Sequence, residues 1–200
     1  MIRQATFPLL FVLSPTLQSD PAEVIGRRVH RAALRRQPVV LGSAATPYEP
    51  GGRGESPLRQ LLTLGDGLEI AIITASARIL RELELLAELD RRHSVTVRLL
   101  VPVGAAPGTP PLDPGPRLRA AQSLAAEGIA TVLVAAPATA ESGRIEEELR
   151  FLLEEARGAE IHDVEIDSGA LRGSGRTGLQ KTFQRLRLEH GFPRSFAGRG

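Results

Sequence analysis

Apolar runs of strand length alternate along this chain with longer amphipathic runs, which is the pattern of an α/β domain. The stretch Leu68–Thr74 is almost continuously apolar, as in a strand buried inside a parallel sheet. The other predicted strands are Leu9–Leu13, Val39–Leu41, Val95–Val103, Ile129–Ala136 and Ile161–Ile166. About six strands are too few for a closed eight-stranded barrel. An open partial barrel and a flat doubly wound sheet therefore both remain.

The predicted helices carry apolar residues three and four positions apart, together with start and stop signals. Ser76 precedes one such segment as an N-cap, and Ile79, Leu83 and Leu86 lie on one face of it. The other predicted helices run from Ser19 or Asp20 to about Arg35, and over Leu58–Leu64, Arg117–Glu127, Ile145–Ala156 and Leu179–Glu189. The Gly- and Pro-rich stretches Ser43–Pro57 and Gly104–Pro116 predict irregular loops.

The composition changes after residue 168. Residues 1–168 carry the strand–helix alternation and form the predicted α/β domain. Residues 169–200 are rich in Arg, and Glu189 is their only acidic residue. We interpret this second part as a basic C-terminal extension that contains a helix.

The chain contains 0 Cys, which excludes disulfides, thiolate nucleophiles, zinc sites on sulfur and cysteine-held clusters. The default compartment for such a chain is the cytoplasm. No apolar run approaches the ~20 residues of a membrane-spanning helix, so we expect no membrane span. The apolar stretch Pro8–Leu13 is shorter than the centre of a signal peptide and is better interpreted as a first strand.

Four segments of the chain resemble one known family. They are VLGSAATPYEP (Val40–Pro50), AIITASARILRELELLAEL (Ala71–Leu89), RLRAAQSLAAEGIATVLVAAPATAESGR (Arg117–Arg144) and LRGSGRTGLQKTFQRLRLEHGF near the end. In the same order, they resemble ALGTNTDPYQP, SITTKSPLVLRDLDLLAEL, RLEAIRALAEAGIPVGVLVAPVIPGLND and MRGEGPYAELI…F…A..RLGL of the spore photoproduct lyase-like group of radical S-adenosylmethionine enzymes. The resemblance covers most of the chain and implies a partial, open (β/α) barrel.

The departures from this family concentrate where its chemistry lies. The family's first strand and its CxxxCxxC loop, which holds a 4Fe–4S cluster, are expected to be missing, because Met1 lies a few residues before the counterpart of the second strand. The polar TNTD is replaced by Ser43-Ala44-Ala45-Thr46, the family lysine by Ala75, and Asn-Asp by Gly143-Arg144. The resemblance thus implies a pseudoenzyme without catalytic residues, cofactor or metal.

A vestigial pocket is the candidate site at the strand ends. Its residues would be Ser43, Thr46, Tyr48, Thr74 and Ser76. A metal site at His162 and the acidic residues after it is less favoured than an edge strand with one polar face. The serines lack the context of a hydrolase nucleophile, and the Gly-rich loops lack the spacing of phosphate-binding motifs.

Basic residues form a second candidate surface. Those expected to contact a nucleic acid or a partner protein are Arg27, Arg28, Arg31, Arg176, Lys181, Arg185 and Arg187. The formal net charge is only +2 and aromatic residues are 4% of the chain, so a stacking platform for bases is not indicated.

Three functions follow from these observations. The first is an inactive structural or interaction subunit, which binds a protein partner or forms a homo-oligomer because the strand Leu9–Leu13 would be an uncovered sheet edge. The alternatives are a nucleic-acid-associated module related to DNA repair, or the cluster-less half of a split radical enzyme.

Overall fold

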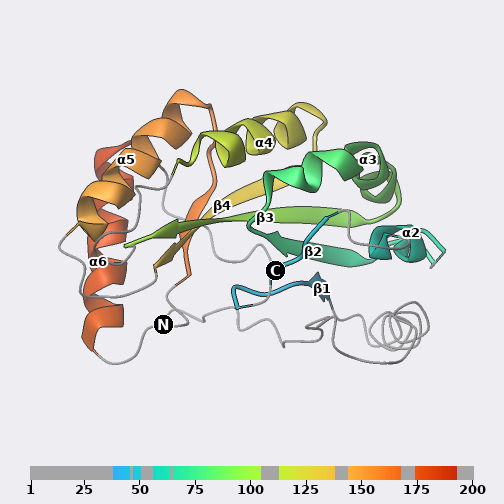
Figure 1. The fold of residues 1–200 in the computed structure, drawn as a ribbon, viewed down its shortest axis with the longest axis horizontal. Coiled ribbons are helices and arrows are strands. Elements are labelled where there is room, and N and C mark those ends of the chain that lie inside the picture. The colour runs from blue at the N-terminus through green and yellow to red at the C-terminus, as the bar shows by residue number, and fades with distance from the viewer. Residues whose placement is uncertain are drawn as a thin grey trace. The chain divides into compact units, whose positions relative to one another are not determined.

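The computed structural model describes seven stretches of the chain (Figure 1), namely residues 38–45, 47–50, 56–63, 65–104, 113–137, 144–167 and 174–192. The predicted strand Leu9–Leu13, the helix that ends near Arg35, and Thr46 lie outside them. The strands are β1 (Val39–Leu41), β2 (Glu69–Thr74), β3 (Ser94–Val103), β4 (Ala130–Pro137) and β5 (Val164–Ile166). The helices are α2 (Pro57–Leu61), the 3₁₀ helix η1 (Ala77–Glu82), α3 (Leu83–Arg92), α4 (Gly115–Ala126), α5 (Ile145–Gly158) and α6 (Ser174–Glu189).

The described strands form a five-stranded parallel sheet in the order β1-β2-β3-β4-β5. Each strand thus lies beside its neighbours in the sequence, and the order does not reverse as it does in a doubly wound sheet. The register pairs Val39 with Ile70 at one end of the sheet and Leu133 with Val164 at the other. No described helix is long and apolar enough to cross a membrane.

Two compact units divide the chain. The N-terminal unit comprises residues 38–98 and 123–131 of the described part, and the C-terminal unit comprises residues 99–122 and 132–192. Helix α6, which the sequence assigns to a basic extension, belongs to the same unit as β5 and packs against α5.

The core of the N-terminal unit follows from residue alternation on β2 and helical periodicity on η1 and α3. Ile70 and Ile72 are fully buried, whereas Glu69, the first residue of β2, is exposed. Ile79, Leu86 and Leu89 are also fully buried. Burying each of these side chains contributes about 1.5–3 kcal/mol relative to leaving it in water.

The core of the C-terminal unit is built in the same way. Leu149 and Leu153 of α5 and Phe183 and Leu186 of α6 are buried at helical spacing. Exposed ion pairs also join the two helices, because Arg185 lies 2.7 Å from Glu146 and Arg150 lies 3.7 Å from Glu189.

The loop predicted over Gly104–Pro116 extends too far, because α4 already begins at Gly115. Asp113 starts this helix: its Oδ1 accepts a hydrogen bond from the Gly115 N–H at 2.8 Å. A side-chain acceptor just before the first turn satisfies an N–H that has no partner within the helix. Gly128, in the left-handed conformation at φ 80°, follows the end of the helix as predicted.

Gly42 allows the chain after β1 to return very close to β2. Its φ is +84°, and a Cβ built on it would overlap the Ile73 carbonyl oxygen and lie 2.5 Å from the Tyr48 nitrogen. These two backbone groups are hydrogen-bonded to each other at 2.7 Å. A side chain at position 42 would therefore separate the returning chain from the strand.

We expect Gly42→Ala to lower the free energy of unfolding by about 3 kcal/mol, since left-handed strain and overlap with fixed backbone atoms add together. The measurement is urea unfolding followed by far-ultraviolet circular dichroism. Gly67→Ala is the matched control, because Gly67 has φ +82° but nothing within 4 Å of the added Cβ. It should cost only about 1 kcal/mol, from the strain alone. Equal losses in the two variants would show that the close approach at Gly42 is unimportant.

Candidate functional site

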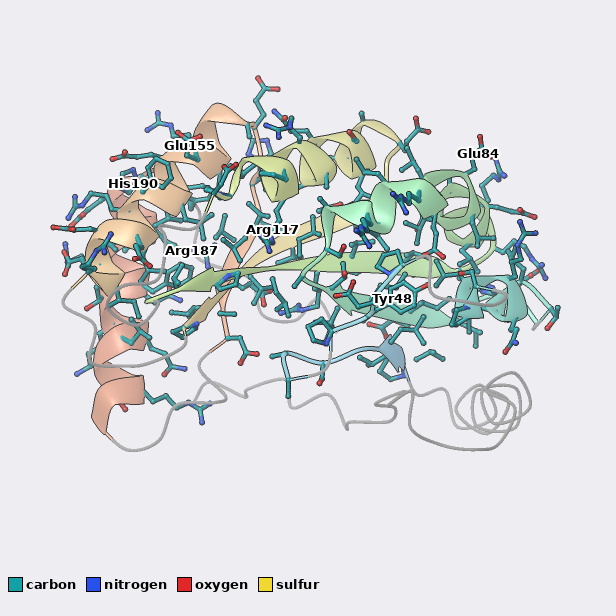
Figure 2. The ribbon with its side chains drawn as sticks, in the orientation of Figure 1. Tyr48, Glu84, Arg117, Glu155, Arg187 and His190 are labelled. Atoms are coloured by element: carbon teal, nitrogen blue, oxygen red, sulfur yellow. The ribbon has the colours of Figure 1, made fainter. Side chains whose placement is uncertain are left out.

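The predicted pocket residues are brought together at the carboxyl end of β2. Thr74 is the last residue of this strand and is fully buried. Ser76 follows it as the N-cap of η1, and its side-chain oxygen accepts the Arg78 N–H at 3.3 Å. Tyr48 arrives from the loop after β1 (Figure 2), and its N–H donates to the Ile73 carbonyl oxygen. Three of the five predicted residues, Tyr48, Thr74 and Ser76, therefore lie next to one another.

The Thr74 hydroxyl links the loop to the start of η1. It donates to the Tyr48 carbonyl oxygen at 2.6 Å and accepts the Ser76 N–H at 3.1 Å. The backbone of Tyr48 is consequently bonded on both sides, through its N–H to Ile73 and through its carbonyl to Thr74. Both bonds fix the direction in which the Tyr48 side chain leaves the loop.

The Tyr48 hydroxyl donates to Glu82 Oε2 at 2.9 Å and lies 3.4 Å from Ser56 Oγ. Burial raises the Tyr48 pKa, and the Glu82 carboxylate raises it further, although the bond to Ser56 works in the opposite direction. Tyr48 therefore keeps its proton at neutral pH and acts as a hydrogen-bond donor. A phenolate base is not formed here.

Sequence analysis missed two residues that contact the Tyr48 hydroxyl, Ser56 and Glu82. Glu82 is the more informative of the two. It is only 9% exposed, although it is ionisable. The available signal was its position, because it falls three residues after Ile79 and four before Leu86, on the apolar stripe of the helical segment. A carboxylate on such a stripe needs a buried donor, and Tyr48 provides it.

We call Tyr48, Ser56, Thr74, Ser76 and Glu82 the Tyr48 cluster. The hydrogen bonds of these residues run to one another and to the neighbouring backbone. Ser43 is half-buried next to the turn at Gly42, and Thr46 lies outside the described residues. The chemistry of the cluster is therefore that of a structural bridge, which joins the loop after β1 to β2 and η1.

The basic residues predicted to form one surface have different environments in the structure. Arg27, Arg28 and Arg31 lie outside the described residues, Arg176 is half-buried, and Lys181 is exposed. Arg185 donates to Glu146 and to Glu189, each at 2.7 Å. Both carboxylates hold the Arg185 pKa above its usual value, with the Glu146 bond contributing most.

The prediction that Arg187 contacts a nucleic acid or a partner protein at the surface is wrong, because only 2% of this residue is exposed. It follows Phe183 by four residues and Leu179 by eight, so it lies on the buried face of α6. Its guanidinium lies 5.9 Å from the centroid of the Phe183 ring. Burial lowers the Arg187 pKa, and Asp163 and Glu165 partly offset this.

No group of three or more His, Asp or Glu side chains within the described ranges is arranged to hold a metal ion. His93 instead has a structural environment: it is buried, and its Nδ1 accepts the Leu68 N–H at 3.4 Å. Burial is the main cause that lowers its pKa. His162 is exposed.

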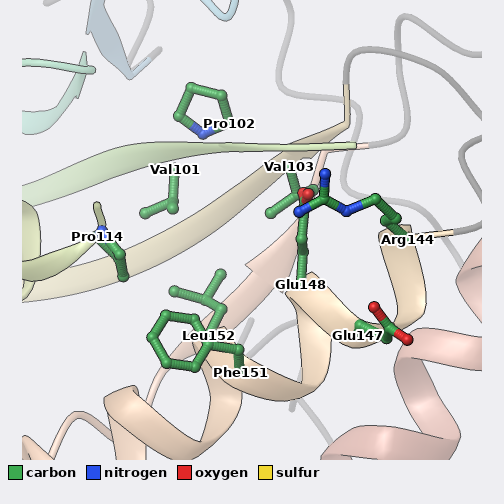
Figure 3. Close-up of a pocket in the computed structure, with 9 residues that line it drawn as sticks. All are labelled: Val101, Pro102, Val103, Pro114, Arg144, Glu147, Glu148, Phe151 and Leu152. Atoms are coloured by element: carbon green, nitrogen blue, oxygen red, sulfur yellow. The ribbon is translucent and has the colours of Figure 1, made fainter. Parts of the chain in front are cut away.

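A groove lies at the end of β3, in the C-terminal unit (Figure 3). Its volume is about 230 Å³, and its lining includes Val101, Val103, Pro114, Phe151 and Leu152. Figure 3 shows the valines of β3 directed toward Leu152 and Phe151 of α5, with Pro102 on the other side of the strand. Sequence analysis did not identify this groove.

Neither the comparison with protein-family models nor the comparison with curated proteins finds a match for this chain. The family resemblance therefore stays a prediction from the four segments quoted above. The functional assignment depends on the residues and contacts of the chain itself.

We expect Tyr48→Phe to lower the free energy of unfolding by about 1–2 kcal/mol, because it leaves the buried Glu82 carboxylate without its donor. Glu82→Gln should cost less, since an amide oxygen still accepts from the Tyr48 hydroxyl. Urea unfolding of the two variants and the wild type measures the difference. A Tyr48→Phe protein as stable as the wild type would contradict the structural role of this bond.

Stability should fall as the pH drops below about 6.5, the ordinary pKa of histidine. Below this pH the unfolded chain binds a proton at position 93, whereas the folded chain, with its lowered pKa, does so only at lower pH. We expect His93→Gln to reduce this loss between pH 7 and 5, as measured by thermal unfolding at each pH. His162→Gln is the control, and an equal effect of both substitutions would count against His93 as the source.

Proposed function

We propose that this chain is a catalytically inactive relative of the radical S-adenosylmethionine enzymes, and that it serves as a structural or interaction subunit of a larger assembly. The observation that carries the proposal is the Tyr48 cluster. In an α/β enzyme, the carboxyl ends of the strands present polar groups to a substrate. Here the Tyr48 hydroxyl donates to Glu82, and the Thr74 hydroxyl binds the Tyr48 carbonyl oxygen and the Ser76 N–H. The Ser76 side-chain oxygen accepts the N–H of Arg78.

We interpret the five-stranded parallel sheet as part of a partial, open barrel. This interpretation is supported by the sequential order of the parallel strands, because right-handed crossovers between successive neighbours keep the helices on one face, as in a barrel wall. A doubly wound sheet would instead require the order to reverse. The strand count of the described part is compatible with a segment of such a barrel.

The amino-acid composition supports the proposed lack of catalysis. Reductive cleavage of S-adenosylmethionine needs an iron–sulfur cluster of low potential, and such clusters are held by cysteine thiolates. The chain has 0 Cys. Ala75 stands where the family pattern has lysine, so a polar group near the strand end is lost as well.

A nucleic-acid module is the less supported alternative. Two of the cations proposed for it are engaged within the fold, Arg185 by carboxylates and Arg187 by burial. Phosphate contacts require exposed cations that can displace condensed counterions. Of the described candidates, this leaves mainly Lys181 and Arg176.

The proposal predicts that the purified chain gains no iron–sulfur cluster when it is incubated anaerobically with iron, sulfide and a reductant. Absorbance at about 400 nm and the iron content of the desalted protein are the measurements. With S-adenosylmethionine added, no 5′-deoxyadenosine should form. A radical enzyme with its three cysteines, treated in parallel, shows that the reconstitution works. A cluster bound to this chain alone would refute the proposal.

The role as a subunit needs a separate measurement. The chain purified at low salt from its native source should elute with a second polypeptide, or a second copy, at a fixed ratio. A single monodisperse monomer would contradict an assembly role. A brown complex in which a second polypeptide supplies the cluster would support the split-enzyme alternative instead.

A further inference from the structure

The groove at the end of β3 has an apolar floor and an exposed aromatic side chain. Val101 and Val103 are almost fully buried below it, whereas Phe151 is 49% exposed. Among the described residues, only Phe151 and Leu188 are large apolar side chains with such exposure. A half-exposed phenylalanine beside a preformed hollow is typical of the anchor positions of protein–protein interfaces.

The size of the groove selects the kind of occupant. Sites for whole small molecules usually enclose about 300–1,000 Å³. This groove has about 230 Å³, which accommodates one or two apolar side chains rather than a cofactor. A second cavity, of about 360 Å³, is lined by Gly115, the residue after Pro114, and by Glu154 and Glu155 of the same helix α5. Both cavities border α5, so a short peptide segment that lies along this helix would contact both of them.

The charge beside these two cavities is negative. Glu147 lines the first cavity, and Glu154 and Glu155 line the second. In the part of the chain that the structure describes, these three carboxylates have no hydrogen bond or ion pair, in contrast to Glu146 of the same helix, which is bound by Arg185 and Arg150. One arginine lines each cavity, Arg144 and Arg119. Carboxylates are thus in excess beside the exposed Phe151.

We propose that this groove is a docking site for a basic peptide segment of a partner protein. An aromatic or leucine side chain of the segment packs against Phe151 and the valines of β3, and neighbouring arginines or lysines pair with the carboxylates of α5. Charge complementarity selects this occupant, since a nucleic acid would be repelled by the same carboxylates. The inference rests on the proposed function as an interaction subunit.

A defined probe tests the proposal. It is the fluorescein-labelled peptide Gly-Arg-Leu-Phe-Arg-Lys-Gly, titrated with the full chain and followed by fluorescence anisotropy. We expect a dissociation constant on the order of 100 μM, because the contact is small. Replacing Phe of the peptide by Ala, or its three basic residues by Glu, should weaken binding at least tenfold. Added salt should weaken it as well, by screening the charge pairs.

Two pairs of variants locate the site. Phe151→Ser should weaken binding about tenfold, whereas Leu188→Ser, at 52% exposure on α6, should leave it unchanged. Glu154→Lys with Glu155→Lys should have a similar effect, and Glu84→Lys with Glu88→Lys on α3 should not. The four glutamates are exposed, and Phe151 and Leu188 are half-exposed. The variants should therefore fold, and circular dichroism verifies this.

Other outcomes overturn the proposal. Absence of peptide binding, or equal binding by Phe151→Ser and Leu188→Ser, would do so. So would binding of a labelled single-stranded oligonucleotide that Phe151→Ser abolishes. These results leave the proposed lack of catalysis untouched, because that is tested by cluster reconstitution. Conversely, a reconstituted cluster would refute the inactive role while leaving peptide binding to be judged on its own data.

Discussion

The arrangement at the carboxyl end of β2 depends on the chain passing within hydrogen-bonding distance of Ile73 after it leaves β1. Gly42 permits this, since any Cβ there would occupy the space of the Ile73 carbonyl and the Tyr48 nitrogen. The Tyr48 backbone is then fixed from two sides, by Ile73 and by the Thr74 hydroxyl. From this position the Tyr48 ring extends to Glu82, so a backbone constraint determines a side-chain contact between segments 34 positions apart.

The same contacts give a physical reason why this strand end is unsuited to bind a polar ligand. A hydroxyl that donates to a buried carboxylate would have to break that bond before it could contact a substrate, and would leave a buried charge without a donor. Thr74 likewise holds both the loop and the start of η1. Stability and ligand binding would compete for the same few atoms, and in this structure the internal bonds use them.

Much of the fold could be predicted because apolar runs mark the strands and glycines such as Gly42 and Gly104 follow their ends. β5 was predicted too long, since Ile161–Asp163 precede the strand and the Ile161 N–H donates to the Ala156 carbonyl at the end of α5. Residues close in sequence to strand ends, such as Thr74 and Ser76, were found by their position. Glu82 was missed because its partner is remote in sequence, and Arg187 was misplaced because charge was given more weight than its helical register.

Helix α5 shows how one amphipathic segment can serve two purposes. Its buried leucines bind it to the C-terminal unit, and Glu146 and Arg150 connect one flank to α6. Within the described residues, the other flank keeps Glu147, Glu154 and Glu155 without partners next to Phe151. A carboxylate in the first turn of a helix, such as Glu147, interacts favourably with the helix dipole. Glu154 and Glu155 lie near the C-terminus of α5, where a negative charge interacts unfavourably with the dipole and weakens the helix. The proposed basic peptide would give Glu154 and Glu155 a favourable partner beside the exposed Phe151, which the helix dipole does not.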